Sequence, residues 1–176
     1  MVVRTIQLEA LHFPPSSWVP NHPSLPVLVY WKALGQEHGD LPSEFERLFL
    51  SAGWEGSWHN GVFGYQHYHV GAHEALGIAD GTAELLIGGP DGANLGVRGG
   101  DCLVLPAGTG HMCLRHGADF LVVGSYPPGQ FADIQTNAAT AWDRETIASL
   151  PIPSSDPIYG REGALIDLWA PRPRLD

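Results

Sequence analysis

The stretch GYQHYHVGAHEALGIADG, Gly64 to Gly81, concentrates three histidines and a glutamate in a short length of chain. Side chains on a strand alternate between its two faces, so His67 and His69 should point the same way, about 6.6 Å apart along the strand. Two imidazoles at that separation can bind one ion, with each nitrogen about 2.0 to 2.1 Å from the metal. These two histidines are therefore candidate metal ligands.

A further ligand from the same stretch depends on how the chain turns. Glu74 lies five positions after His69, which places it on the wrong face of a straight strand. Gly71 lies between them and favours a reversal, after which Glu74 faces inward from a neighbouring strand. If the turn differs by one residue, His73 takes that place instead. Spacing alone leaves both alternatives open.

A helical arrangement of these histidines is excluded. His69 and His73 are four residues apart, as in the zinc-protease helix, but that motif needs glutamate directly after the first histidine. Val70 stands there, and Gly71 weakens any helix.

The composition of the chain restricts its partners and its compartment. Nine Lys and Arg against nineteen Asp and Glu give a formal charge of −10 in 176 residues, which argues against a nucleic-acid surface. Apolar runs are all shorter than the roughly 20 residues that a membrane-spanning helix needs. The start MVVRTIQLEALHF does not resemble a secretory signal, and two cysteines are too few for a disulfide framework. We therefore expect a cytoplasmic protein with free thiols, with no nucleic-acid or membrane partner.

Glycine-rich turns between short apolar segments predict a mostly β fold. The residues from Trp58 to Tyr126 form seven strand-like pieces, beginning with VFGYQHYH, with Gly, Asn and Asp between them. Before them, LPVLVYW (25–31) predicts a strand and residues 42–52 an amphipathic helix. After them, residues 141–150 predict a second helix and ALIDLW (164–169) a final strand. Trp54 and Trp58 are expected to pack the first helix against the sheet.

A second stretch, GDCLVLPAGTGH, ends in another histidine, and the two stretches together resemble the cupin superfamily. The first cupin motif has the order Gly, His-x-His, Glu, Gly at fixed intervals, and its matches here are Gly61, His67, His69, Glu74 and Gly81. The second motif is matched by Gly100, Pro106, Gly108 and His111, with Arg115 where asparagine is usual. The match covers Gly61 to Arg115. More weakly, the two ends of the chain resemble a group of short uncharacterised bacterial cupin proteins.

This resemblance implies an all-β fold, an antiparallel cupin β-barrel (double-stranded β-helix or jelly roll) with one or two flanking helices. It also implies one divalent transition metal (Fe, Mn, Ni or Zn) bound by His67, His69, Glu74 and His111. The alternative is a polar barrel interior without metal. One structural domain is expected, with an N-terminal extension (1–57) packing on the barrel, a barrel core (58–128), and a C-terminal helix and tail (129–176). A homodimer is expected because related barrels pair their edge strands.

Four further residues are candidates for the wall of a substrate pocket: Tyr65, Cys113, Arg115 and Phe63. Tyr65 and Phe63 share the strand parity of the two histidines, although they could equally fill the core. Cys113 and Arg115 share the parity of His111. Cys113 could instead be a small buried apolar group, and Arg115 could lie at an exposed edge.

The function predicted from these residues is that of a metal-dependent enzyme acting on a small organic molecule. Three imidazoles and a carboxylate leave two positions of a six-coordinate ion free for substrate, water or O₂. Dioxygenase-type chemistry is the first expectation and isomerase the second; no catalytic residue is assigned. The alternatives are a non-catalytic module that binds or senses a metal or small ligand, and a closed structural zinc site.

Overall fold

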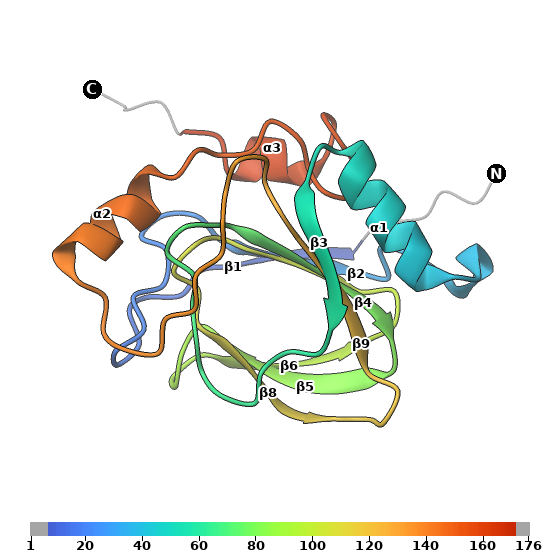
Figure 1. The fold of residues 1–176 in the computed structure, drawn as a ribbon, viewed down its shortest axis with the longest axis horizontal. Helices are drawn as coiled ribbons and strands as arrows, with labels where there is room; N and C mark the ends of the chain where they lie inside the picture. The colour runs from blue at the N-terminus through green and yellow to red at the C-terminus, as the bar shows by residue number, and fades with distance from the viewer. Residues whose placement is uncertain (1–6, 172–176) are drawn as a thin grey trace.

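The computed structural model describes residues 7–171, and the strands in that range form two antiparallel sheets rather than a closed barrel. The larger sheet has six strands in the order β1-β2-β7-β4-β9-β3, and the smaller has three in the order β6-β5-β8. Figure 1 shows the smaller sheet lying below the larger one. The predicted closed barrel is thus corrected to a mostly β, two-sheet fold.

The strand bounds follow the predicted segments closely from residue 74 to residue 126. The larger sheet contains β1 (Gln7–Leu11), β2 (Val27–Trp31), β3 (Glu55–Asn60), β4 (Glu74–Asp80), β7 (Cys102–Leu105) and β9 (Leu121–Tyr126). The smaller sheet contains β5 (Thr82–Ile87), β6 (Ala93–Arg98) and β8 (His111–His116). Because β2 pairs with β7, the segment expected as an N-terminal extension contributes strands to the larger sheet.

Alternation along the strands divides the core into two layers. Leu76 and Ile78 of β4 face the smaller sheet and pack in a cluster with Leu85 and Ile87 of β5. Their neighbours Ala75 and Ala79 face the opposite side, where the helices lie. A residue's parity on β4 therefore decides whether it points between the sheets or toward the helices.

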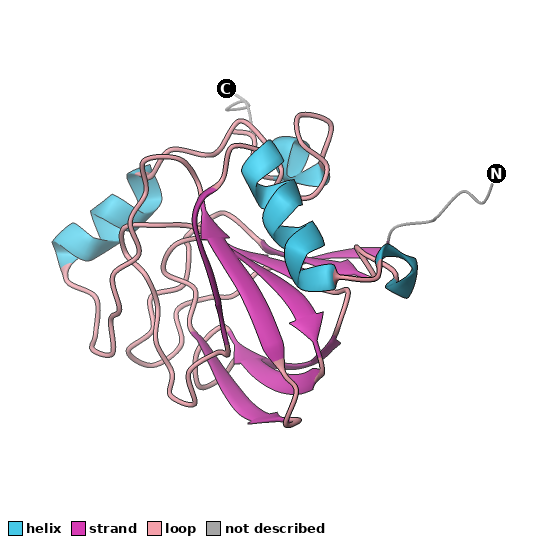
Figure 2. Cartoon of the chain, turned by 45° about the vertical axis from the view of Figure 1, so that its right-hand side comes forward, coloured by secondary structure: helices cyan, strands magenta, loops and turns pink. Residues whose placement is uncertain are grey.

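Helix α1 (Leu41–Ser51) covers the helical side of the larger sheet (Figure 2). Asp40 caps its first turn by accepting from the backbone N–H of Ser43 at 3.3 Å. Phe45 and Phe49, four residues apart, are both fully buried. A Cβ at Gly77 of β4 would lie 2.6 Å from the Phe45 ring, so glycine is what lets α1 approach the sheet. The predicted helix is confirmed.

The other helices are α2 (Ala141–Ser149) and α3 (Ala164–Leu168), with a 3₁₀ turn η1 at Gln36–His38. The α2 prediction is confirmed, and Thr140 and Asp143 cap that helix reciprocally. The predicted strand at 164–169 is wrong. Leu165 and Trp169, four residues apart, are both fully buried, a helical period inside a short apolar run.

The predicted strand at 62–69 is also wrong, because consecutive residues there pair with different neighbours. His67 forms an isolated bridge with His111, whereas Tyr68 forms one with Gln135. No continuous ladder can form under that arrangement. Strands β1 and β3 were not predicted, since neither shows regular alternation.

In the described part of the chain, no helix combines the length and hydropathy needed to cross a membrane. The first six and last five residues of the expected N- and C-terminal segments lie outside the described range.

Candidate metal centre

Three histidines from two distant stretches meet between the sheets. His67 and His69 lie in the connection between β3 and β4, and His111 is the first residue of β8. The backbone of His67 and that of His111 exchange hydrogen bonds of 3.2 and 2.9 Å, which fixes one stretch against the other. Each ring offers a nitrogen to a common point, and these nitrogens lie within 4.8 Å of one another. We call these residues, with Glu74, the histidine centre.

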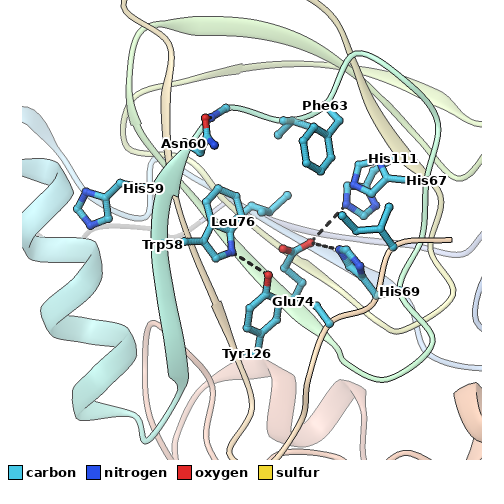
Figure 3. A pocket seen from close by; sticks show the side chains of 14 residues that line it. Trp58, His59, Asn60, Phe63, His67, His69, Glu74, Leu76, His111 and Tyr126 are labelled. Carbon is cyan, nitrogen blue, oxygen red and sulfur yellow. Dashed lines mark hydrogen bonds and ion pairs between the residues drawn. The ribbon is translucent and has the colours of Figure 1, made fainter. Parts of the chain in front are cut away.

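Glu74 completes the histidine centre from β4 (Figure 3). Its Oε2 lies 3.1 Å from Nε2 of His69 and 3.3 Å from Nε2 of His111. Glu74 shares the parity of Leu76 and so faces between the sheets, whereas His73 faces the helices and its ring lies 5.0 Å from that of Trp169. The turn thus directs Glu74, not His73, to the other three residues.

The other ring nitrogen of each histidine is anchored to the backbone. Nδ1 of His67 lies 3.0 Å from the carbonyl of Tyr65, and Nδ1 of His111 lies 2.9 Å from that of Thr109. Nδ1 of His69 contacts the carbonyl of Asp133. Because a carbonyl oxygen can only accept, each Nδ1 must carry the proton, and each neutral ring presents an Nε2 lone pair. Such anchoring is typical of metal-ligating histidines.

The electrostatics of the histidine centre suit a cation. Two Nε2 lone pairs face an ionised carboxylate oxygen at close range, so the group needs a bound proton or a metal ion between them. Without a metal, protons on Nε2 of His69 and His111 fill this place. Burial opposes ionisation of Glu74, but the charge of His69 and the hydrogen bonds from His111 and His69 outweigh it and hold the pKa of the carboxyl below its usual range. Although burial opposes its charged form, Glu74 in turn raises the pKa of His69, so a metal ion would displace these protons. For His67, burial and then the charge of His111 lower the pKa to about 3, which keeps its lone pair free at neutral pH. The donor set therefore fits a divalent transition metal.

A cavity of about 340 Å³ opens beside the histidine centre. Its remaining wall is mostly apolar and aromatic, and is formed by Trp58, His59, Asn60, Gly61, Val62, Phe63, Leu76, Tyr126, Ala132 and Ile134. Figure 3 shows Trp58 and Tyr126 on the side of Glu74 away from the rings of His67 and His111. The metal position would thus have one side against the protein and one side open to this space.

Trp58 and Tyr126 form a hydrogen-bonded pair in that wall. Nε1 of Trp58 donates to the Tyr126 hydroxyl at 2.9 Å. Burial and the nearby Glu74 carboxylate both raise the pKa of Tyr126, so the phenol keeps its proton. A Cβ at Gly124, which pairs with Trp58 across the two strands, would lie 2.0 Å from the indole. Trp58 was predicted to pack against the helix; the structure places it in the cavity instead.

Of the four predicted pocket residues, only Phe63 lines the cavity. Tyr65 stacks on Phe63 with ring centroids 4.9 Å apart and is 46% exposed. Cys113 is buried in the apolar layer between the sheets. This position agrees with the second of its two predicted roles, that of a small buried apolar group. Arg115 pairs with Glu84 at 2.5 Å on the outer surface.

A β-bulge explains the position of Arg115. Along the pairing of β5 with β8, Leu85 faces Cys113 but Glu84 faces Arg115, so Leu114 is an extra residue. The bulge reverses the parity after Cys113, and the expectation that Arg115 continues the face of His111 is therefore corrected.

Trp58, Tyr126 and Asp133 were missed by sequence reasoning. Asp133 reaches His69 through its backbone carbonyl, while its carboxylate accepts from the N–H groups of Val70 and Gly71 at 2.8 Å each. Nothing in the sequence around Asp133 indicates that it contacts His69 and the backbone of Val70 and Gly71. These contacts join residues more than sixty positions apart, which no spacing rule connects.

The fold and the histidine centre define a two-sheet β protein with a metal-type donor set, and comparison with known proteins places it in a family. The chain is 35% identical over 165 residues to the uncharacterized protein YjlB of Bacillus subtilis (strain 168), a match covering 93% of this chain and 97% of YjlB. The chain belongs to the same family as YjlB. No family profile matches it. Among solved structures it is similar to acireductone dioxygenase from Bacillus anthracis with a cadmium ion in the active centre, with 17% identity, a TM-score of 0.36, and coverage of 73% and 78% of the two chains.

Proposed function

We propose that this protein is a metal-binding cupin in which His67, His69, Glu74 and His111 hold one divalent transition metal. The observation that carries the proposal is the common orientation of the three rings. Each donates Nδ1–H to a backbone carbonyl, and the Nε2 atoms of His69 and His111 lie 3.1 and 3.3 Å from the buried Glu74 carboxylate. In a polar interior without metal, the Nε2 atoms of His69 and His111 would have to carry protons toward Glu74 instead.

We infer further that the protein is an enzyme acting on a small organic molecule, with dioxygenase-type chemistry as first choice and isomerase as second. A metal in this site would supply Lewis acidity or, if it is iron, activation of O₂. The chain itself would supply four of the ligands, a wall that excludes water, and the Tyr126 hydroxyl as a proton donor at the edge of the cavity. The cavity lies where a substrate could reach the open side of the centre.

The alternative, a non-catalytic module that binds or senses a metal or small ligand, has one observation in its favour. Apart from the four candidate ligands, the titratable groups in the cavity wall are His59 and Tyr126 among the residues described. The protein therefore offers few groups of its own for acid–base catalysis, and any chemistry depends on the metal.

The first test is the metal content of untagged protein purified without air or chelator, measured by elemental mass spectrometry beside His69→Ala. Near-stoichiometric iron, manganese or nickel that disappears in the variant supports the site and justifies screening small substrates for oxygen consumption. Stoichiometric zinc with no ligand binding supports a structural or binding role. Absence of metal from both samples refutes the proposed centre.

A further inference from the structure

The wall of the cavity beside the histidine centre carries no lysine or arginine among the residues described. The described lysines and arginines lie elsewhere: Arg47 pairs with Glu44 on α1, Arg115 pairs with Glu84 on the smaller sheet, and Arg161 is exposed before α3. Lys32 and Arg98 lie in a separate surface hollow with Asp101, and Arg144 lies in a cleft beside α2. An anionic substrate group in the cavity would find no fixed cation from these side chains.

The polar groups at the rim do not replace that cation. His59 lies with Nε2 3.4 Å from Glu46, so a carboxylate already stands next to it. The side-chain carbonyl of Asn60 accepts from the backbone N–H of Gly61 at 2.8 Å. The formal charge of the whole chain, −10, adds repulsion toward anions.

The charge within the histidine centre sets a limit on what can bind. A divalent ion with the Glu74 carboxylate and three neutral imidazoles carries one net positive charge. One ionised oxygen on a ligand balances it. A second anionic group, such as a phosphate or an additional carboxylate, would be desolvated against Leu76 and Val62 with no partner, which is costly.

The same wall disfavours polyhydroxylated ligands such as sugars. Hydroxyl groups placed against Trp58, Leu76 and Phe63 would lose their water without gaining acceptors or donors. Aromatic and aliphatic surfaces of this kind suit an apolar ring. At about 340 Å³ the cavity is at the small end of ligand sites, which limits the ligand to about the size of one substituted ring.

We propose, on the basis of the metal function proposed above, that the cavity binds a small apolar molecule with two neighbouring oxygen donors and no more than one ionised group. The two oxygens would bind a metal held by the histidine centre, and the apolar body would lie against Trp58, Phe63 and Leu76. Phosphorylated or multiply carboxylated substrates are rejected.

The test compares catechol with 3,4-dihydroxybenzoate by titration calorimetry on the manganese-loaded protein without O₂. Bound through a diol that releases one proton to the buffer, catechol brings one ionised group and 3,4-dihydroxybenzoate brings two. Catechol should bind at least tenfold more tightly. Equal binding of the two probes, tighter binding of 3,4-dihydroxybenzoate, or binding of neither probe to protein that contains manganese overturns the inference.

A charge introduced at the rim should reverse the preference. Ile134 is 51% exposed and lines the cavity, so Ile134→Lys should strengthen binding of 3,4-dihydroxybenzoate about tenfold and leave catechol within about threefold. The matched control is Leu50→Lys on the outer face of α1, where a 70% exposed side chain should change neither affinity. Ala132→Lys, at another position of the same wall, serves if Ile134→Lys does not fold. An unchanged ratio in the folded rim variant contradicts the inference.

Manganese content measured on the same samples separates the two proposals. Protein that binds manganese but prefers 3,4-dihydroxybenzoate refutes the ligand class and leaves the metal function standing. Protein that binds no manganese or other transition metal refutes the metal function, and the ligand class fails with it.

Discussion

Two groups of buried histidines lie on opposite sides of the larger sheet, and only one resembles a metal site. At the histidine centre, Glu74 pairs with two of three rings. On the helical side, His73 and His22 have ring centroids 6.2 Å apart, and within residues 7–171 neither ring pairs with a carboxylate. Glu74 and His73 are adjacent in sequence, so the alternation of a single strand separates the two environments.

The two groups also use their nitrogens in opposite ways. Nδ1 of His73 accepts from the backbone N–H of Ala107 at 2.9 Å, and Nδ1 of His22 accepts from that of Leu25 at 2.9 Å. In a neutral ring the proton must then be on Nε2, the reverse of the tautomer at the histidine centre. Among these five buried histidines, the backbone group that meets Nδ1, a carbonyl or an N–H, separates the two groups, whereas burial does not.

The largest expected effect on metal affinity comes from neutralising Glu74, compared with a change at its neighbour His73. Glu74→Gln removes the charge that faces two Nε2 atoms. Loss of a residue that only supports a ligand lowers metal affinity by up to about 100-fold, so loss of a charged ligand should lower it by more than that. His73→Asn should keep full metal content, because it lies on the helical side. Elemental mass spectrometry after dialysis against a fixed chelator concentration measures both. Equal loss in the two variants would remove the distinction between the two groups.

A smaller loss of metal affinity is expected when the hydroxyl of Tyr126, which lies near Glu74, is removed. Tyr126→Phe keeps the ring but removes the hydroxyl that accepts from Trp58 and lies near Glu74, so metal affinity should fall by about 10- to 100-fold. Competition with a metal-responsive dye reports the change. Tyr65→Phe is the control, since Tyr65 is outside the cavity and should leave affinity unchanged; if both variants behaved alike, the pairing of Trp58 with Tyr126 would have no role in metal binding.

The two histidines on the helical side, His22 and His73, should affect how the free energy of unfolding depends on pH rather than metal binding. Burial lowers the pKa of His22 to about 4, from about 6.5 in an unfolded chain. Below pH 6.5 the unfolded state then binds more protons, so stability is lost as pH falls to about 4, with a slope of up to about 1.4 kcal/mol per pH unit. His22→Asn keeps an acceptor for Leu25 and removes that slope.

Urea unfolding of wild type and His22→Asn with chelator present, at pH 8, 6.5, 5.5 and 4.5, measures this difference. The two curves of stability against pH should run parallel above pH 6.5 and diverge below it. Parallel curves down to pH 4.5 would show that His22 is not held neutral by burial.

The smallest effect is expected at the arginine that was predicted for the pocket. Arg115→Ala removes an ion pair whose arginine side chain is 83% exposed. Exposed pairs of this kind contribute little, so melting temperature and metal content should stay within error of wild type. A loss of ligand affinity in this variant would place Arg115 in the pocket after all, against its position beyond the bulge.

Local periodicity was enough to find part of this molecule. The i, i+4 spacing of Phe45 and Phe49 predicted α1, and the His-x-His spacing brought out two residues of the histidine centre. The short run at 164–169 was misinterpreted because its helical pair, Leu165 and Trp169, is hidden among other apolar residues. Strand β3 was missed because five of its six residues are exposed, so it shows no alternation.

The remaining errors have a different physical origin. The extra residue Leu114 in β8 reverses parity without any glycine or proline to announce it, and so misplaced Arg115. Trp58, Tyr126 and Asp133 reach the histidine centre through contacts between distant strands and loops. Such positions depend on how the sheets are assembled, and a single sequence does not encode them as a local pattern. A homodimer stays a prediction, which sedimentation velocity would check.

The close fit of Trp58 over Gly124 has a consequence for how the cavity could change shape. Any side chain at position 124 would occupy the volume of the indole, so a relative that has alanine or serine there must also have a smaller residue at position 58. These two positions should covary across the YjlB family. For protein engineering, the pair is the place where the back of the cavity can be deepened by one substitution or refilled by the other.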